Sequence, residues 1–501
     1  MTIASPVVAH ALTGQAVGNY PKQAVVVIHG MGEQKPMDTI KNFARAVWRT
    51  EDVPEGQADP YEIWSKPDTR TGSLELRRLT TRPSTPNAAF LKGVRQDFYE
   101  LYWADLSGGS TWDQVKNWIA MLLFRNPATR VPRSVRLAWV LLWLVALVAA
   151  VLVIAAALPA PEAGPGGYTL LLWNHPPFAW LVGVPSWLLV ATVAFLGWLM
   201  NYLIVPYFGR VVRYTRAVPD NIASRKKIRE RGLRLLDDLH KEEYDRIIVV
   251  GHSLGSLLAY DLVSYFWAMR HAAHTVKTGT PAFEHLCTLE KLTAEREGEM
   301  NATWSARYEE ARRALCRELR TRPGPTTATE RDTRWLITDL VTVGSPLGHA
   351  DFLLASSPAD MKSRIEQREY ASCPPVRETV DSDKVQEARD AGLLDADAEP
   401  KLFCFSLGHD DEWQLHHAAQ FAVVRWTNIH DPARLVFFGD IVSAPASPIF
   451  GPGVKDVDLK ELRKSQSWCF SHTRYWVEGT PVPEHLEQLR LALDLARQGN
   501  P

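Results

Sequence analysis

The chain has 501 residues, 46% of them hydrophobic, which is enough for one large domain with insertions. Its 56 basic and 57 acidic residues give a net charge of −1, which argues against nucleic acid as a partner. The five cysteines are scattered without a Cys-x-x-Cys pair, so the common zinc and dithiol motifs are excluded and a reduced, cytoplasm-facing protein is expected. The N-terminus lacks a basic region followed by an apolar core, so no cleaved secretory signal is expected.

The first elements in the chain are a leader and a strand. Residues 1–20 are small, polar and unpatterned, and they predict a flexible leader. Residues 22–28 predict a buried strand that runs into a glycine-containing turn, where a backbone amide of Met31 or Gly32 can stabilise an oxyanion. Taken alone, this turn is equally an ordinary strand-to-loop connection. A helix and two strands are expected to follow, at residues 38–48, 74–80 and 98–104.

Two long uncharged segments predict a transmembrane hairpin over residues 125–209. Residues 137–158 carry no charge and, at about 1.5 Å per residue, are long enough to cross a hydrocarbon core of about 30 Å. A Pro/Gly-rich connector separates them from a second uncharged segment at 178–205, in which prolines mark a bend and an end. The alternative is a pair of buried helices in a large globular domain, which rarely run this long without charge.

The flanking charges predict the orientation of this hairpin. Arginines precede its first helix and Arg/Lys residues follow its second, whereas the connector at 159–177 carries Glu162 and no Lys or Arg. By the positive-inside bias, both flanks are cytoplasmic and the connector lies outside. We therefore expect a protein of the inner (cytoplasmic) membrane, spanning it with two helices, with the lipid bilayer as a partner and both termini in the cytoplasm.

A Gly-x-Ser-x-Gly motif follows, between a predicted strand at 246–250 and a predicted helix. Gly251 and Gly255 allow a tight turn in which the backbone passes close by, and the turn lifts the hydroxyl of Ser253 above the sheet edge. It also directs the amide of Leu254, at the start of a helix, toward an oxyanion on a substrate carbonyl. The motif therefore predicts a nucleophile, although alone it is also compatible with a plain Gly/Ser loop.

The segments around and after this motif predict the rest of the sheet and its helices. Residues 222–244 predict an amphipathic helix, and residues 284–334 predict a helical insertion that is either a lid or a charged surface excursion. The polar segment 356–400 is expected to be irregular. The remaining predictions are strands at 336–343, 402–406 and 421–427, and a helix at 484–497.

A serine becomes a nucleophile only when a base removes its proton and an acid orients that base. In α/β-hydrolases the chain order is serine, acid, histidine, which limits the search to residues beyond 253. His472 is favoured as the base because it lies late, between a strand and the terminal helix. His485 is in the predicted last helix, and His416 and His417 fit the lining of a pocket. The other competing histidines are His409 and His430.

Two aspartates follow the penultimate predicted strand. They are Asp431, in Thr427-Asn-Ile-His-Asp-Pro432, and Asp440, in Gly439-Asp-Ile-Val-Ser-Ala-Pro445. Their position does not separate them, and either can instead cap a turn.

Several motifs together resemble a group of membrane-anchored bacterial α/β-hydrolases, distantly similar to lipases and to the deacylases that trim lipid-anchored proteins. The resemblance covers nearly the whole chain outside the hairpin, and the serine elbow is its most specific part. The motifs are His29-Gly-Met-Gly-Glu-Gln34, Tyr102-Trp-Ala104, Gly251-His-Ser-Leu-Gly255, Val343-Gly-Ser-Pro-Leu347, Arg425-Trp-Thr-Asn428, Gly439-Asp-Ile-Val442 and Ser471-His-Thr-Arg-Tyr-Trp476.

The resemblance favours Asp440 as the acid. In related lipases the acid lies in an Asp-x-Ile/Val segment followed by small residues and a proline, as Asp440 does here. The segment departs from the usual pattern because Ser443 and Ala444 stand where relatives often have glycines.

The expected fold is an α/β-hydrolase fold, a mostly parallel sheet flanked by helices, built from residues 21–124 and 210–501. The expected function is hydrolysis of a carboxylic ester of a lipid or acylated substrate through Ser253, His472 and Asp440, with no metal or organic cofactor. The alternatives are a catalytically silent membrane scaffold on the same fold, or a thioesterase or amidase.

Overall fold

The computed structural model describes most of the chain outside its N-terminus and the segment between residues 108 and 218. The predicted leader and almost all of the predicted transmembrane hairpin lie outside the described residues. Within the part that is described, no helix is both long and apolar enough to cross a membrane. The described ranges are 20–30, 35–49, 59–72, 75–84, 86, 93–107, 219–295, 301–320, 334–408, 411–433, 438–459, 471–479 and 481–495, with scattered residues from 124 to 214.

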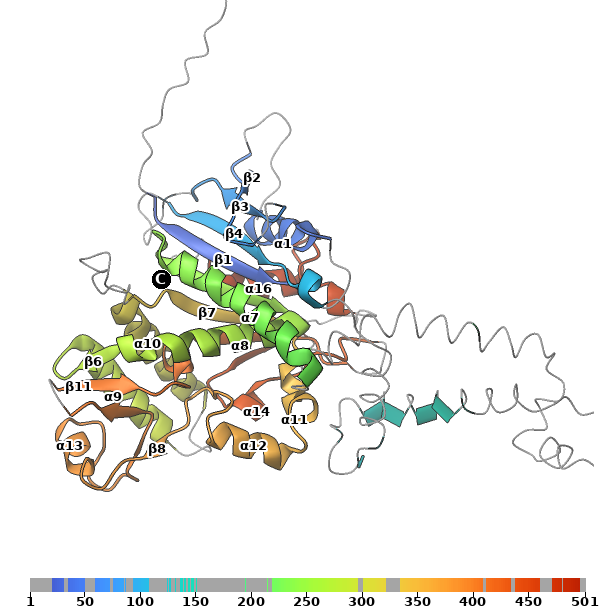
Figure 1. The fold of residues 1–501 in the computed structure, drawn as a ribbon. Coiled ribbons are helices and arrows are strands. Elements are labelled where there is room, and N and C mark those ends of the chain that lie inside the picture. The colour runs from blue at the N-terminus through green and yellow to red at the C-terminus, as the bar shows by residue number, and fades with distance from the viewer. Residues whose placement is uncertain are drawn as a thin grey trace, which may run out of the picture.

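A mostly parallel sheet of eight strands organises the fold (Figure 1). The strand order is β13-β12-β7-β5-β1-β4-β3-β2; the first six are parallel, and β3 and β2 form an antiparallel edge. The molecule therefore has an α/β fold. The strand bounds are β1 Lys22–Ile28, β2 Ile63–Pro67, β3 Arg77–Thr81, β4 Arg95–Leu101, β5 Arg246–His252, β7 Ile337–Val343, β12 Arg425–His430 and β13 Lys455–Asp458.

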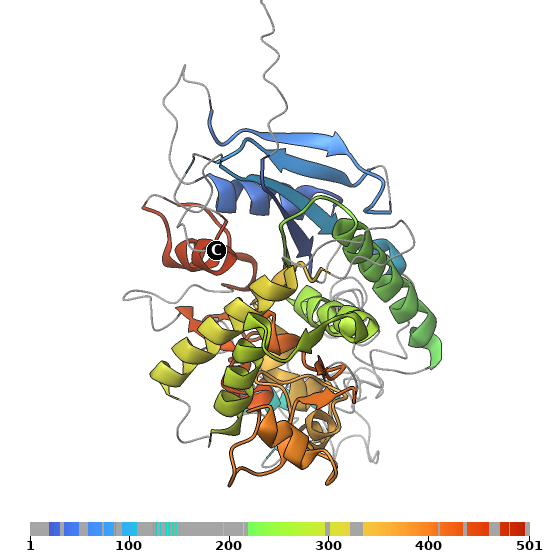
Figure 2. The same cartoon turned by 90° about the vertical axis from the view of Figure 1, so that its left-hand side faces the viewer.

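Helices cover both faces of this sheet, and Figure 2 shows α16 and α7 on opposite sides of it. Along β1, Val25 and Val27 pack in a core with residues of α1 and α16, whereas Val26 and Ile28 pack in a core with α7 and α8. Because successive side chains of a strand alternate between faces, an apolar strand of this kind must be covered on both. The bounds are α1 Asp38–Trp48, α7 Pro219–His240, α8 Leu254–Arg270 and α16 Glu484–Leu493.

The predicted helical insertion contains two helices, α9 Pro281–Ala294 and α10 Ala302–Arg320, which pack on each other. One face of α10 is buried, and its Tyr308 hydroxyl donates a hydrogen bond to the carbonyl of Phe421 (3.1 Å). Glu309 of α10 lies 3.8 Å from Arg425, the first residue of β12. These contacts are at the amino end of β12, whereas Ser253 lies at the carboxyl end of β5, so we do not propose α9 and α10 as a lid.

The segment 356–400, expected to be irregular, contains the helices α12 Pro358–Glu366 and α13 Val385–Asp390. The start of α12 has an ordinary signal, because the Ser357 side chain accepts a hydrogen bond from the Asp360 amide and a proline follows it. The remaining elements are α11 Ala350–Leu353, α14 Ser447–Phe450, a three-stranded sheet of β6 Thr275–Lys277, β10 Cys404–Ser406 and β11 Glu412–Leu415, and the pair β8 Glu378–Thr379 and β9 Lys401–Leu402.

Candidate active site

Ser253 lies in a sharp turn between the end of β5 and the start of α8. Its backbone has φ 54° and ψ −130°, a strained conformation for a residue with a side chain. A Cβ atom added to Gly251 would lie 2.5 Å from the Cα of Ser256, and one added to Gly255 would lie 2.3 Å from the carbonyl oxygen of Ile28. Both flanking positions therefore require glycine, because backbone atoms occupy the space that a side chain needs.

Ser253, His472 and Asp440 form one chain of hydrogen bonds. The distance from Ser253 Oγ to His472 Nε2 is 2.8 Å, and the distance from His472 Nδ1 to Asp440 Oδ2 is 2.9 Å. Ser253 and Asp440 are almost fully buried, whereas the His472 side chain is partly exposed. In this arrangement the aspartate holds the imidazole with Nδ1 protonated and Nε2 ready to accept the serine proton.

The Asp440 carboxylate has two further donors. The Tyr475 hydroxyl donates a hydrogen bond to Oδ2 (2.7 Å), and the Val442 amide donates one to Oδ1 (2.9 Å). Burial opposes ionisation of Asp440, but the bonds from His472, Tyr475 and Val442 outweigh it and hold its pKa below the ordinary value. The carboxylate therefore stays charged beside the imidazole at neutral pH.

The alternative acid, Asp431, lies in the same loop region and contacts the Asp440 segment through its backbone. Its carbonyl oxygen accepts a hydrogen bond from the Asp440 amide (2.8 Å), and its own amide donates to Ser443 Oγ (3.1 Å). The carboxylate bonded to His472 Nδ1 is that of Asp440.

One of the predicted oxyanion donors is described and two are not. The amide of Leu254 is the first of α8, where N–H groups have no partner within the helix and carry partial positive charge. Met31 and Gly32 lie outside the described residues. Gly30, just before them, is in close contact with the nucleophile, since a Cβ atom there would be 2.6 Å from Ser253 Cβ.

Trp103 fixes the turn that contains Gly30. Its amide donates a hydrogen bond to His29 Nε2 (3.2 Å), and its indole N–H donates one to the His29 carbonyl (2.9 Å). The two rings also stack, with centroids 5.4 Å apart. Trp103 belongs to the Tyr102-Trp-Ala104 motif. Its contact with His29 becomes visible only in the structure, where β4 pairs with β1.

His252 is a second residue that contacts the candidate site and that the sequence did not assign to it. Its Nε2 is 2.8 Å from the backbone carbonyl of His472, and its ring packs edge-on against Trp476 at 4.8 Å. Burial, as the main cause, and the nearby His472, as the second, lower the pKa of His252 to about 3. His252 is therefore neutral, and its Nε2–H donates the hydrogen bond to the His472 carbonyl. The residue before Ser253 thus positions the loop that carries His472.

The other candidate histidines have structural contacts or lie elsewhere. His416 is buried, its Nε2 contacts the carbonyl of Val376 (2.8 Å), and burial lowers its pKa to about 4. His485 lies in α16 and contacts the carbonyl of Val477 (3.0 Å). His430 is buried at the end of β12, His417 is beside His416, and His409 lies outside the described residues.

Comparison with protein-family models, with curated proteins and with solved structures found no match. The chemical interpretation of this site therefore rests on its own geometry.

Proposed function

We propose that this protein is a serine hydrolase that cleaves a carboxylic ester through an acyl-enzyme intermediate. The observation that carries the proposal is the hydrogen-bonded chain Ser253–His472–Asp440, with Ser253 in a strained turn. A nucleophile, a base within 2.8 Å and a buried acid that orients the base form the arrangement that acyl transfer requires.

The proposed reaction has two halves. His472 Nε2 removes the proton from Ser253 Oγ as this oxygen attacks the ester carbonyl, and Asp440 stabilises the imidazolium that forms. The Leu254 amide and one amide of the turn at Met31 and Gly32 hold the oxyanion. His472 then protonates the leaving alcohol, and a water molecule activated by the same histidine releases the carboxylic acid and regenerates the serine.

The arrangement of the sheet supports an α/β-hydrolase fold as its finer class. The serine follows a central parallel strand, β5, the acid follows β12, and the histidine follows β13, which is the chain order serine, acid, histidine. The carboxyl ends of parallel strands share one edge of a sheet, so all three residues reach the same place.

A lipid or acylated substrate is proposed from the sequence. The uncharged segments 137–158 and 178–205, with basic flanks, support a membrane-anchored enzyme whose site faces the cytoplasm. An anchor concentrates the site where lipid esters are. A catalytically silent scaffold is less well supported, because binding alone does not need an aligned serine, histidine and aspartate. A thioester or amide substrate uses the same three residues.

The test is labelling of the full chain in detergent with a fluorophosphonate probe. We expect wild type to be labelled, Ser253→Ala to be unlabelled, and turnover of a short-chain p-nitrophenyl ester to fall by more than about 1000-fold in this variant. Ser305→Ala, at an exposed position of α10, is the control and should behave as wild type. Unchanged labelling of Ser253→Ala would refute the assignment of the nucleophile.

A further inference from the structure

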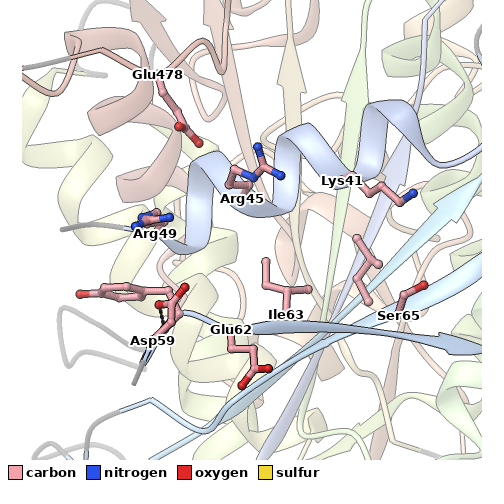
Figure 3. Close-up of a pocket in the computed structure, with 10 residues that line it drawn as sticks. Lys41, Arg45, Arg49, Asp59, Glu62, Ile63, Ser65 and Glu478 are labelled. Carbon is pink, nitrogen blue, oxygen red and sulfur yellow. Dashed lines mark hydrogen bonds between the residues drawn. The ribbon is translucent and has the colours of Figure 1, made fainter. Parts of the chain in front are cut away.

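A pocket of about 540 Å³ lies between α1 and the β2–β3 hairpin, at the antiparallel edge of the sheet. None of its lining residues belongs to the site around Ser253. Figure 3 shows three basic side chains spaced along α1 and at its end, with Asp59 and Glu62 on the other side of the pocket, near β2. The apolar part of the lining is Ile63 and Leu79.

The basic side chains are Lys41 and Arg45 of α1 and Arg49, which directly follows the helix and whose amide donates to the Arg45 carbonyl (2.9 Å). They recur every fourth residue and so lie along one side of the helix. Lys41 and Arg45 are exposed and Arg49 is partly buried. None of the three has an ion pair within the described part of the chain, and the buried Nε of Arg49 has no hydrogen-bond partner there. Three cations in a row that form no ion pair with a described residue predict attraction for an anion.

Two of the three carboxylates of the pocket have counter-charges other than this row. Glu62 forms an ion pair with Arg82 (2.6 Å), and Glu478 interacts electrostatically with Arg490. Asp59 accepts a hydrogen bond from the Tyr61 amide (2.8 Å). The lining therefore carries three cations and three carboxylates, and two of these carboxylates are engaged by arginines outside the lining, Arg82 and Arg490.

We propose that this pocket binds the phosphate group of a phosphate ester, held by Arg45 and Arg49 and assisted by Lys41. Two arginines four residues apart, with Cβ atoms about 6 Å apart, can direct their guanidinium groups at one tetrahedral anion from two sides and donate several charge-assisted hydrogen bonds. Ile63 and Leu79 offer apolar surface to the organic part of the ligand. The phosphate can come from a soluble ester or from a lipid headgroup, and the same side chains serve both.

The test is isothermal titration calorimetry of the full chain in neutral detergent with inorganic phosphate, glycerol 3-phosphate and, as a carboxylate control, acetate. We expect both phosphates to bind and acetate to bind at least about tenfold more weakly, because a carboxylate offers fewer acceptors. Arg45→Gln should weaken phosphate binding about tenfold, and Arg45→Gln with Arg49→Gln should weaken it further. The single variant changes only an exposed side chain, so it tests the site even where the double variant is unstable.

The matched control is Lys362→Gln with Arg389→Gln, which removes two exposed helical cations outside the pocket. This control should bind phosphate as wild type does. The proposal fails if wild type binds none of the phosphates, if acetate binds equally well, or if the control loses as much affinity as the pocket variants. To distinguish a lipid headgroup from a soluble ester, the affinities of dihexanoyl phosphatidic acid, dihexanoyl phosphatidylcholine and glycerol 3-phosphate are compared. Tightest binding of either lipid indicates a headgroup, and tightest binding of glycerol 3-phosphate indicates a soluble ester.

Discussion

Tyr475 and His472 bond to the same oxygen of Asp440, at 2.7 and 2.9 Å. Two donors on one carboxylate oxygen compensate for the loss of water around a buried charge. The Tyr475 ring also lies against Gly344, where a Cβ atom would be 2.7 Å from Tyr475 Cε2. Tyr475 therefore stabilises the charge of the Asp440 carboxylate and fixes its position.

Replacing Tyr475 by Phe removes this donor and keeps the ring. On the proposed mechanism, we expect kcat for ester hydrolysis to fall about tenfold with KM nearly unchanged, because the lost bond stabilises the carboxylate that faces the imidazolium. Tyr308→Phe, which removes a buried hydroxyl bonded to the Phe421 carbonyl, should leave kcat unchanged. Steady-state kinetics of both variants checks this, and an equal loss in the two would indicate a general effect on folding.

The sequence indicated which residues would come together at the site better than it indicated the contacts around them. Ser253 stood out because its motif is local, and His472 and Asp440 were selected by chain order and by resemblance. The contacts of Tyr475 and His252 appear only in the fold, which brings Tyr475 to Asp440 and joins His252 to the His472 carbonyl 220 residues away. No local pattern encodes such a contact.

At the scale of elements, the turn at Ser253 depends on close packing between β1 and the start of α8. The carbonyl oxygens of Ile28 and His29 would lie 2.3 and 2.4 Å from a Cβ atom at Gly255. Both oxygens belong to the backbone at the carboxyl end of β1, a central strand of the sheet. They therefore cannot move away as a flexible side chain would.

Gly255→Ala is therefore expected to lower the free energy of unfolding by about 3 kcal/mol or more, and to abolish labelling by the fluorophosphonate probe. Gly279→Ala is the matched control, because Gly279 has φ +78° and no atom within 4 Å of the added Cβ. At Gly279 the substitution adds backbone strain but no clash, and we expect it to lower the free energy of unfolding by about 1 kcal/mol. Thermal unfolding of the two variants distinguishes a steric clash from strain, and equal losses would contradict the clash.

Element prediction succeeded where a local signal was undisturbed by tertiary structure. The predicted strand at 22–28 and helix at 38–48 coincide with β1 and α1. The prediction of a strand from residue 421 was wrong at its start, because Gln420–Ala422 form a 3₁₀ turn and β12 begins at Arg425. Phe421 and Ala422 are fully buried, and a short buried apolar run does not reveal its own conformation.

Across the whole molecule, buried charges join parts of the chain that are distant in sequence. Asp339 of β7 accepts hydrogen bonds from Arg246 of β5 and Arg425 of β12, and these arginines also donate to carbonyls at the end of α16. Burial opposes the charge of Asp339, but the two arginines outweigh it and hold its pKa well below the ordinary value. This network stabilises the fold above the unfolded-state pKa of an aspartate, about 3.9, and is lost as the pH falls.

Glu290 gives the opposite pH dependence of stability. It joins α9 to the small sheet, where its Oε1 accepts hydrogen bonds from the amides of Phe403 (2.8 Å) and Cys404 (3.0 Å). Burial raises the pKa of Glu290 from 4.5 to about 8, against these bonds. The folded state therefore holds a proton that the unfolded state releases above pH 4.5, so stability falls as the pH rises from about 4.5 to about 8.

In that range, one such proton contributes a loss of about 1.4 kcal/mol per pH unit. Glu290→Gln keeps an oxygen acceptor for the two amides and removes the titration, so its thermal midpoint should decline less steeply than that of wild type between pH 5 and 8. Glu366→Gln, at an exposed position of α12, is the control and should follow wild type. Parallel midpoint curves for wild type and Glu290→Gln would show that Glu290 does not carry this pH dependence, and the buried Glu100, whose pKa burial raises to about 7, would then be the group to replace.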